Sequence, residues 1–373
     1  QAKIRSSVGY TGNVTFSPYQ AQTTYQYSSD NIYLNGVGAD IIALGNEDLK
    51  WQRKFTVNLG CDLDFWEGRF SLTGEYFREY TKDVLMDISL PPSLGFIDYK
   101  ENFGEMENKG WSLNLRTQML RDTERELYWS LAFGTSDSKN KIKKITDKLG
   151  AMNDENNKNE TKKPVPLYEE GESLDALKAV PSLGIDPETG KEVFVKKDDS
   201  LTTIWDYNDK VVCGTTDPKF RGTLNSFLTF KGISLNMSFN FQWGGQTYNQ
   251  TLASRVEGVN PNSNCDRRVL YDRWKKPGDI TDIPRYGVTA QLDDRFLENS
   301  SFLRLKNLTL AYAFPQSLLK KTNFFTSARV YLQGQNLLTW TGFTGLDPEV
   351  ATNVYRAQYP ASRQFTLGID VSF

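Results

Sequence analysis

The final segment of the chain, residues 363–373, constrains the fold more than any other. Its apolar side chains stand at every second position, with polar or small residues between them: Phe365, Leu367, Ile369, Val371 and Phe373. Because successive side chains of a strand point to opposite faces, this pattern predicts a strand with one apolar and one polar face. In water such a terminal edge strand would invite aggregation. A transmembrane barrel needs this arrangement, with lipid outside and a polar interior. A soluble sandwich also contains alternating strands.

The same alternation recurs along the chain. The runs are 4–10, 55–65, 70–76, 111–119, 127–133, 224–230, 233–243, 308–314, 330–332 and 365–373. The longest have 9 to 11 residues, and about ten residues suffice for a tilted strand to cross a bilayer. No stretch of about 18 apolar residues is present, so the sequence offers no transmembrane helix. The chain is therefore expected to be all-β, with roughly ten antiparallel strands.

The lengths of the connections favour a barrel over a sandwich. Short connections lie at 66–68, 121–125 and 231–232, with a moderate one at 315–327. Long connections alternate with them, at 12–51, 80–109, 137–219, 244–301 and 341–362. Short turns at one end and long loops at the other are typical of outer-membrane barrels, with the long loops extracellular and the carboxyl terminus on the periplasmic side. Ten strands alone would leave two open edges in lipid. We therefore expect residues 1–373 to form the last ten strands of a barrel of about 22, completed by residues upstream of Gln1.

Composition excludes several other classes of protein. The net charge of -2 is too small to indicate nucleic-acid binding, and the absence of histidine removes the commonest zinc ligand and general base. No metal or cofactor motif is present. Asp62 and Asp64 form a carboxylate pair, but they fall on the polar face of a strand, so we do not expect catalysis. The run 153–161 is rich in oxygen ligands yet lacks the spacing and glycine of a calcium loop, and we expect a solvated loop tip.

Three further features lie in or near the loops. Cys61 falls on an apolar strand face, while Cys213 and Cys265 lie in loops, where a disulfide between them is one possible pairing in an oxidising compartment. Segment 185–191 contains proline and glycine and is expected to form a turn between short strands. Segment 265–275 has apolar residues at helical spacing and predicts a short helix.

An ordered set of motifs resembles the SusC/RagA class of TonB-dependent transporters of Bacteroidetes. The motifs cover nearly the whole chain, at 11–13, 16–19, 44–51, 90–96, 104–110, 272–274, 283–286, 301–310, 334–339, 345–349 and 359–360. The most typical is the run that begins Ser301, Phe302, Leu303 and Arg304. Any one motif is a weak signal, whereas the set in family order is specific.

The resemblance implies a function that spacing alone does not give. It implies an outer-membrane nutrient importer, not an enzyme, that takes up glycans or peptides. A SusD-like surface lipoprotein would cover its extracellular mouth, and TonB, ExbB and ExbD would supply energy through a plug and an amino-terminal region upstream of Gln1. This chain alone would then neither gate nor transport. Residues such as Asn58, Asn114, Asn236 and Asn240 are expected to line the interior wall.

Aromatic residues of the loops and strand tops are the candidate ligand contacts, because sugars and peptides present apolar faces that stack on such rings. They are Trp205, Tyr207, Tyr248, Trp274, Tyr286, Trp340 and Phe343. Each has the alternative role of loop packing, contact with the lipoprotein lid or, for Trp243 and Trp340, the outer aromatic girdle. Two other functions stay open. A soluble glycan-binding β-sandwich would fold completely within this chain, and a β-rich glycoside hydrolase would need a carboxylate pair that nothing nominates.

Overall fold

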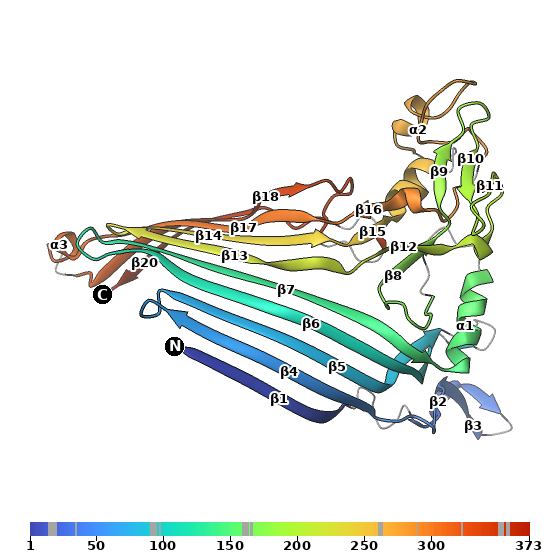
Figure 1. Cartoon of the computed structure of the whole chain (residues 1–373), viewed down its shortest axis with the longest axis horizontal. Helices are drawn as coiled ribbons and strands as arrows, with labels where there is room; N and C mark the ends of the chain where they lie inside the picture. The colour runs from blue at the N-terminus through green and yellow to red at the C-terminus, as the bar shows by residue number, and fades with distance from the viewer. Residues whose placement is uncertain are drawn as a thin grey trace.

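One large antiparallel β-sheet forms most of the structure (Figure 1). The computed structural model describes residues 1–13, 21–33, 36–89, 95–96, 98–158, 164, 167–259, 264–288, 290–321, 324–349, 354–355 and 359–373. The ten strands of the sheet, in spatial order, are β1 (Ala2–Asn13), β4 (Gln52–Phe65), β5 (Phe70–Ser89), β6 (Asp98–Asp122), β7 (Leu127–Ile145), β13 (Pro218–Phe230), β14 (Ile233–Gly244), β17 (Phe302–Ala313), β18 (Ser327–Thr341) and β20 (Gln364–Ser372). The expectation of an all-β chain with about ten antiparallel strands is confirmed.

The remaining elements are short, and most of them belong to the long loops. The strands are β2 (Thr24–Tyr33), β3 (Gly36–Ala43), β8 (Ala176–Ala179), β9 (Ser182–Ile185), β10 (Glu192–Val195), β11 (Leu201–Thr202), β12 (Val211–Thr215), β15 (Gln246–Asn249), β16 (Leu297–Asn299) and β19 (Val354–Tyr355). The helices are α1 (Asp147–Lys158), α2 (Arg268–Tyr271), α3 (Gln316–Leu319), the 3₁₀ helices η3 (Tyr207–Asp209) and η5 (Asp294–Phe296), and the π-helix η4 (Leu252–Glu257). Within the described residues, no helix is both long enough and apolar enough to span a membrane.

The strand register gives the large sheet one apolar and one polar face. On the apolar face, a row of directly paired residues runs across six strands, namely Leu367, Leu332, Leu310, Leu235, Leu228 and Trp129. On the polar face, a row runs across eight strands, namely Asp62, Thr73, Asn114, Gly134, Thr223, Asn240, Arg304 and Thr339. The four asparagines expected on the interior wall all lie on this polar face.

The apolar face is exposed. The terminal-strand residues show it most clearly, with exposed fractions of 72% for Phe365, 73% for Leu367, 70% for Ile369, 43% for Val371 and 71% for Phe373. A soluble sandwich would bury such a face against a second sheet. The sandwich alternative is therefore wrong, and the exposed face requires an apolar environment.

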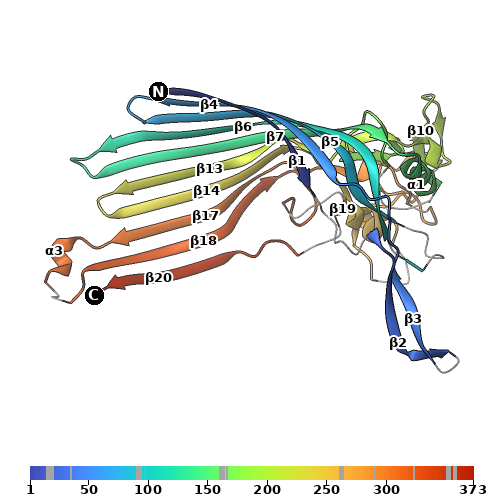
Figure 2. The same ribbon diagram turned by 90° about the horizontal axis from the view of Figure 1, so that it is seen from below.

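Turns and loops segregate to opposite ends of the sheet, as the connection lengths predict (Figure 2). At one end, strands β13 and β14 are joined by Lys231 and Gly232 alone, with φ values of 47° and 83°. Two positive φ values match the right-handed twist of the flanking strands, which explains how so short a hairpin forms. At the other end lie the segments between β7 and β13 and between β14 and β17.

Strands β5, β6 and β7 extend into segments that were expected to be loops, and β7 continues to Ile145. Strand β5 continues to Ser89 and β6 begins at Asp98, so most of the segment 80–109, expected to be a loop, is paired sheet. Ionic pairs between strands replace apolar ones here: Arg78 with Glu107 at 2.6 Å, Lys54 with Glu79 at 2.8 Å and Lys100 with Asp87 at 2.6 Å. Because these strands alternate charged residues rather than apolar ones, a search for hydrophobic period two misses them.

Other expectations concern the loops. The turn 185–191 between β9 and β10 and the helix within 265–275 are confirmed, the latter as α2. The solvated loop tip at 153–161 is wrong, because residues 153–158 are helical in α1; residues 159–161 lie outside the described residues, as do the motifs 16–19 and 90–94. Cys213 and Cys265 are both free thiols. Cys213 is half-buried and its thiol donates to the carbonyl oxygen of Ala179 at 3.4 Å, whereas Cys265 is exposed, so no disulfide joins them.

Candidate functional site

The segments 176–215 and 246–299, here called the loop cluster, fold together at the loop end of the sheet (Figure 1). Strand β12 pairs with β8, β15 pairs with β16, and β10 lies between β9 and β11. A parallel bridge between Val180 and Asp293 joins the first segment to the second. Because both segments contribute to one another's backbone hydrogen bonds, they form a single folded unit rather than two independent loops.

A small hydrophobic core holds the loop cluster together. Its buried members are Ala179, Tyr248, Ala253, Leu292 and Phe296. The rings of Tyr248 and Phe296 meet edge to face at 5.8 Å between centroids. Trp205 covers this core and donates from Nε1 to the carbonyl oxygen of Leu292 at 3.0 Å. Burying a side chain of this size contributes about 1.5–3 kcal/mol, so a few of them suffice to order a short-stranded unit.

Arg295 binds three carboxylates beneath this core. Its Nε lies 2.8 Å from Glu192 Oε1, and its NH2 lies 2.8 Å from Glu257 Oε1 and 3.1 Å from Asp293 Oδ2. The acids come from β10, from the π-helix η4 and from the residue before η5, and all three are nearly inaccessible. Burial, with the neighbouring Glu192 carboxylate, raises the pKa of Asp293 well above its usual range, and burial likewise raises the pKa of Glu257. The arginine therefore ties three loop segments together at one point.

The turn between β9 and β10 packs tightly on Trp274. Gly190 has φ +67°, and a Cβ there would lie 2.4 Å from the indole ring, so only glycine fits. The indole Nε1 donates to the carbonyl oxygen of Pro187 at 2.8 Å. The backbone amide of Arg285 donates to the carbonyl oxygen of Gly190, also at 2.8 Å. These contacts fix the segment 272–288 against the turn.

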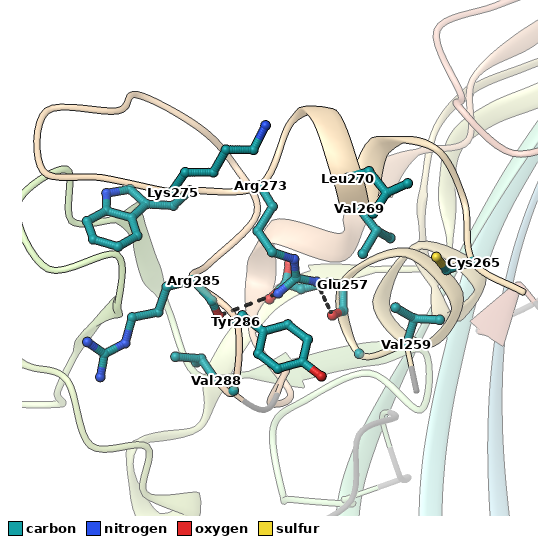
Figure 3. A pocket seen from close by; sticks show the side chains of 13 residues that line it. Glu257, Val259, Cys265, Val269, Leu270, Arg273, Lys275, Arg285, Tyr286 and Val288 are labelled. Carbon is teal, nitrogen blue, oxygen red and sulfur yellow. Dashed lines mark hydrogen bonds between the residues drawn. The ribbon is translucent and has the colours of Figure 1, made fainter. Parts of the chain in front are cut away.

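A cavity of about 770 Å³ opens beside this segment (Figure 3). Its lining comprises Glu257, Gly258, Val259, Cys265, Val269, Leu270, Arg273, Trp274, Lys275, Arg285, Tyr286, Gly287 and Val288. The guanidinium of Arg273 donates to the carbonyl oxygens of Glu257 and Pro284, both at 3.1 Å, and so holds the π-helix and the segment 283–288 apart at a set distance. The volume lies within the range of about 300–1,000 Å³ that is usual for ligand pockets.

A second polar cluster attaches the segment after β18 to the polar face of the sheet. Arg304, which is 3% exposed, forms ion pairs with Asp347 and Glu349 and donates from Nε to Thr339 Oγ1 at 2.9 Å. Lys306 adds a contact of 3.1 Å to Glu349. The segment around residues 345–349 therefore folds back over the polar face.

The structure separates the predicted aromatic candidates into four groups. Trp274 and Tyr286 line the cavity, with Tyr286 69% exposed. The exposed fraction is 0% for Tyr248 and 6% for Phe343, so both side chains pack in the interior. Trp205 packs against the core that contains Tyr248. Tyr207 begins η3 and is half-buried. Trp340 is 51% exposed at the end of β18, opposite Leu303 on the apolar face.

Sequence reasoning missed the ionic residues that build the site, above all Arg295 and Arg304. Their partners lie in other loops, so no local spacing reveals them. One available signal is that Arg304 stands at a polar-face position within the strand motif 301–310. Asp62, which was expected to lie on the polar strand face without a catalytic role, forms an ion pair with Arg5 on β1 at 2.9 Å.

Comparisons with known proteins give a consistent picture. Residues 4–337 match the family model described as TonB dependent receptor-like, beta-barrel. TonB-dependent receptor P3 of Formosa agariphila is 30% identical over 405 residues, covering 100% of this chain and 39% of that protein. TonB-dependent receptor SusC of Bacteroides thetaiotaomicron is 26% identical over 343 residues, covering 88% and 32%. In the solved structure of the RagAB peptide transporter, a chain that is 28% identical superposes with a TM-score of 0.84, covering 100% of this chain and 41% of that one.

Proposed function

Because the chain belongs to the TonB-dependent receptor-like β-barrel family, we propose that it forms the carboxyl-terminal part of an outer-membrane nutrient importer. Members of this family reside in the bacterial outer membrane, and so does this chain. It spans about two fifths of the length of the curated receptor P3, so transport itself is a property proposed for the longer protein. The apolar face of the sheet then meets lipid, and the polar face lines the lumen.

The observation that carries the proposal is the polar row that crosses eight strands of the sheet. Hydroxyl, amide and charged side chains follow one another from Asp62 to Thr339, interrupted only by Gly134. A wall of this kind suits the passage of hydrated, polar molecules. The loop cluster stands at the extracellular end, where an incoming nutrient arrives first. Glycans or peptides are the substrate classes that we propose.

We further propose two kinds of partner. A SusD-like surface lipoprotein would cover the extracellular end, for which the resemblance to SusC and to the RagAB transporter is the support. TonB, ExbB and ExbD would act through the amino-terminal region of the longer protein. The hydrolase alternative gains no support, since the named relatives are receptors.

Membrane fractionation of the native protein, with intact mass and identification of its partners, tests the proposal. We expect a polypeptide of at least twice 42.5 kDa that requires detergent and purifies with a lipoprotein. A species of about 42.5 kDa that is soluble without detergent and purifies alone would overturn it.

A charge on the lipid face of the terminal strand should impair assembly. Leu367→Arg places a cation in hydrocarbon and is expected to cost about 2–4 kcal/mol near the midplane. Thr366→Arg is the matched control, because Thr366 pairs with Gln333 on the polar face. The folded fraction in outer membranes, read from heat-modifiable migration on gels, should fall for the first variant only. Equal assembly of both variants would contradict the assignment of the two faces.

A further inference from the structure

Three cations stand side by side on the apolar face of the sheet, next to its aromatic residues. Arg78 of β5 pairs in register with Lys109 of β6, and Lys109 pairs with Lys139 of β7, in three strands that lie next to one another (Figure 1). Each cation stands two positions, without a bulge, from a residue of the paired row that contains Tyr76 and Trp111. All three side chains therefore point to the same face as these rings, and all three are exposed. They are here called the basic row.

The basic row lies at the upper limit of the apolar face. On β6, the residues of this face from Leu120, near the short turn, to Trp111 carry no charge, and both of these side chains are exposed. At about 3.3 Å per residue and a tilt of about 35–45°, this stretch spans roughly 21–24 Å, close to the apolar band of about 25 Å that a barrel presents to lipid. Lys109 is the next residue of β6 on that face. The basic row therefore reaches the level of the lipid headgroups, on the side of the long loops.

The acids above the basic row are already paired. Glu107 stands one step higher on the same face, where its Oε1 lies 2.6 Å from Arg78 Nε and its Oε2 pairs with Lys143. Glu105 lies further up and pairs with Lys82 at 3.7 Å. Arg78 therefore has a counter-charge, whereas the two lysines of the basic row form no ion pair with an acid of the described residues.

The acid below the basic row reduces its charge only in part. Asp137 lies one step below Lys139, opposite Trp111, and it is half-buried, with an Oδ1 that solvent does not reach. Within the part of the chain that the structure describes, it forms no ion pair with the row. The cations at this level of the apolar face outnumber Asp137 and Glu107; they are Arg78, Lys109, Lys139, Lys141 and Lys143. The surface is therefore suited to an anion.

Direct pairing of like charges across strands is unfavourable. Directly opposed side chains have Cβ atoms about 4.5–5.5 Å apart, and like charges at that distance repel. At the edge of the hydrocarbon the repulsion is screened less than in bulk water, because the surroundings have a lower dielectric constant. An anion held between the side chains offsets this cost. Phosphate suits the row, since guanidinium and ammonium groups both form short, charge-assisted hydrogen bonds with its oxygens.

We propose that the basic row binds the phosphate of a lipid headgroup in the outer leaflet of the membrane. In the bacterial outer membrane this leaflet contains a phosphorylated glycolipid, lipid A. Its acyl chains pack on the apolar face below the row, and Tyr76 and Trp111 stand at the boundary between chains and headgroup. The row lies on the face opposite to the lumen, which favours a phosphate anchored in lipid over a dissolved one. This inference goes beyond import and rests on the lipid-facing orientation of the sheet.

Lipid binding by the full transporter, purified in detergent with its own lipoprotein, tests the proposal. The probes are monophosphoryl lipid A and the same lipid after removal of its phosphate, so that they differ in this group alone. Native mass spectrometry over a titration of each lipid gives the two affinities. We expect the phosphorylated lipid to bind about tenfold more tightly, a ratio that corresponds to about 1.4 kcal/mol. Equal affinities would overturn the proposal.

Variants locate the binding to the basic row. The double variant Lys109→Gln and Lys139→Gln should bind the phosphorylated lipid about tenfold more weakly and leave the affinity for the dephosphorylated lipid unchanged. Lys54→Gln is the matched control, because Lys54 stands at a similar height on the polar face, where it contacts Glu79 at 2.8 Å. Wild-type affinity of the double variant, or a loss as large in the control, would overturn the assignment.

Thermal unfolding gives a second readout and shows whether the variant folds. In detergent without lipid A, the double variant should melt no lower than the wild type, because it loses repulsion between paired like charges. Phosphorylated lipid A should raise the melting temperature of the wild type, since a ligand of the native state stabilises it, and added salt should reduce this shift. The double variant should not respond. A shift of equal size in both proteins would overturn the proposal.

Two other occupants of the basic row are outcomes of the same experiments. Inorganic phosphate that stabilises the wild type as strongly as lipid A at equal concentration would make this a site for dissolved phosphate and overturn the lipid as its source. A change in the number of copies of the double variant, with lipid affinity unchanged, would make the row a contact between copies and overturn the proposal. Failure of import would affect neither measurement, since both measure the lipid alone.

Discussion

Replacing Arg295 by Met should destabilise the loop cluster by about 3–5 kcal/mol. Removal of one partner from a buried ionic group leaves its counter-charges without compensation. Here three carboxylates, those of Glu192, Glu257 and Asp293, would remain almost fully inaccessible. Hydrogen exchange of the backbone amides in segments 176–195 and 246–299 measures this loss, because local opening exposes them.

The pH dependence of the same variant identifies the cause. Burial raises the pKa of Asp293 and of Glu257 in the folded protein, so the folded state holds protons that the unfolded state has released. Their contribution to stability is therefore present at low pH and declines as the pH rises through the folded-state pKa values. Without Arg295 those values rise further, and the destabilisation should be smaller at pH 5 than at pH 8. Arg255→Met, an exposed change on the same π-helix, is the control. A loss of stability independent of pH would contradict an electrostatic role.

Replacing Arg304 by Met should release the segment 345–349 from the lumenal wall. The buried arginine holds Asp347, which is 2% exposed, and its loss is again expected to cost about 3–5 kcal/mol. The amides of Glu349 and Ala361 both donate to Asp347 at 3.0 Å, so their hydrogen exchange should accelerate together. Either amide gives a local measurement that does not depend on unfolding of the barrel.

Lys306→Met is the matched control for Arg304. The lysine side chain is 39% exposed and contacts only Glu349 among the described acids, so its loss should cost about 0–1 kcal/mol. If both variants accelerated exchange equally, the attachment would depend on Glu349 rather than on Asp347. If neither did, the segment would be held by packing and not by charge.

The large sheet was predictable because its strands carry a strong local signal. In β20 and β14, the lipid face and the lumen face require apolar and polar side chains to alternate strictly. The two-residue turn at Lys231 and Gly232 sets the register between β13 and β14, and this turn can be recognised in the sequence. The upper parts of β5 and β6 were missed for the opposite reason. There Arg78 pairs with Glu107 and Lys54 with Glu79 across strands, so charged residues stand where an apolar period would mark a strand.

The candidate site was only partly predictable, since its parts converge from distant segments. Trp274 and Tyr286 were nominated for their chemistry and do line the cavity, although their contact with a ligand stays a prediction. Tyr248 has the same chemistry but is fully buried, and no local feature distinguishes it from the other two. The segment that carries Trp274 and Arg285 is placed by its contacts with Gly190, which lies in a distant turn that no local pattern connects with it.

The long strands also set how far recognition occurs from the bilayer. Beyond Trp111, charged residues recur on β6 from Lys109 towards the strand start at Asp98. At about 3.3 Å per residue and a tilt near 45°, this charged part rises roughly 30 Å above Trp111. At its top, Val84 and Phe103 pack against Leu149 of α1, which braces the extension. Strands β5 to β7 therefore continue as a braced wall above the rest of the sheet, and the height of this wall is set by paired backbone rather than by loops.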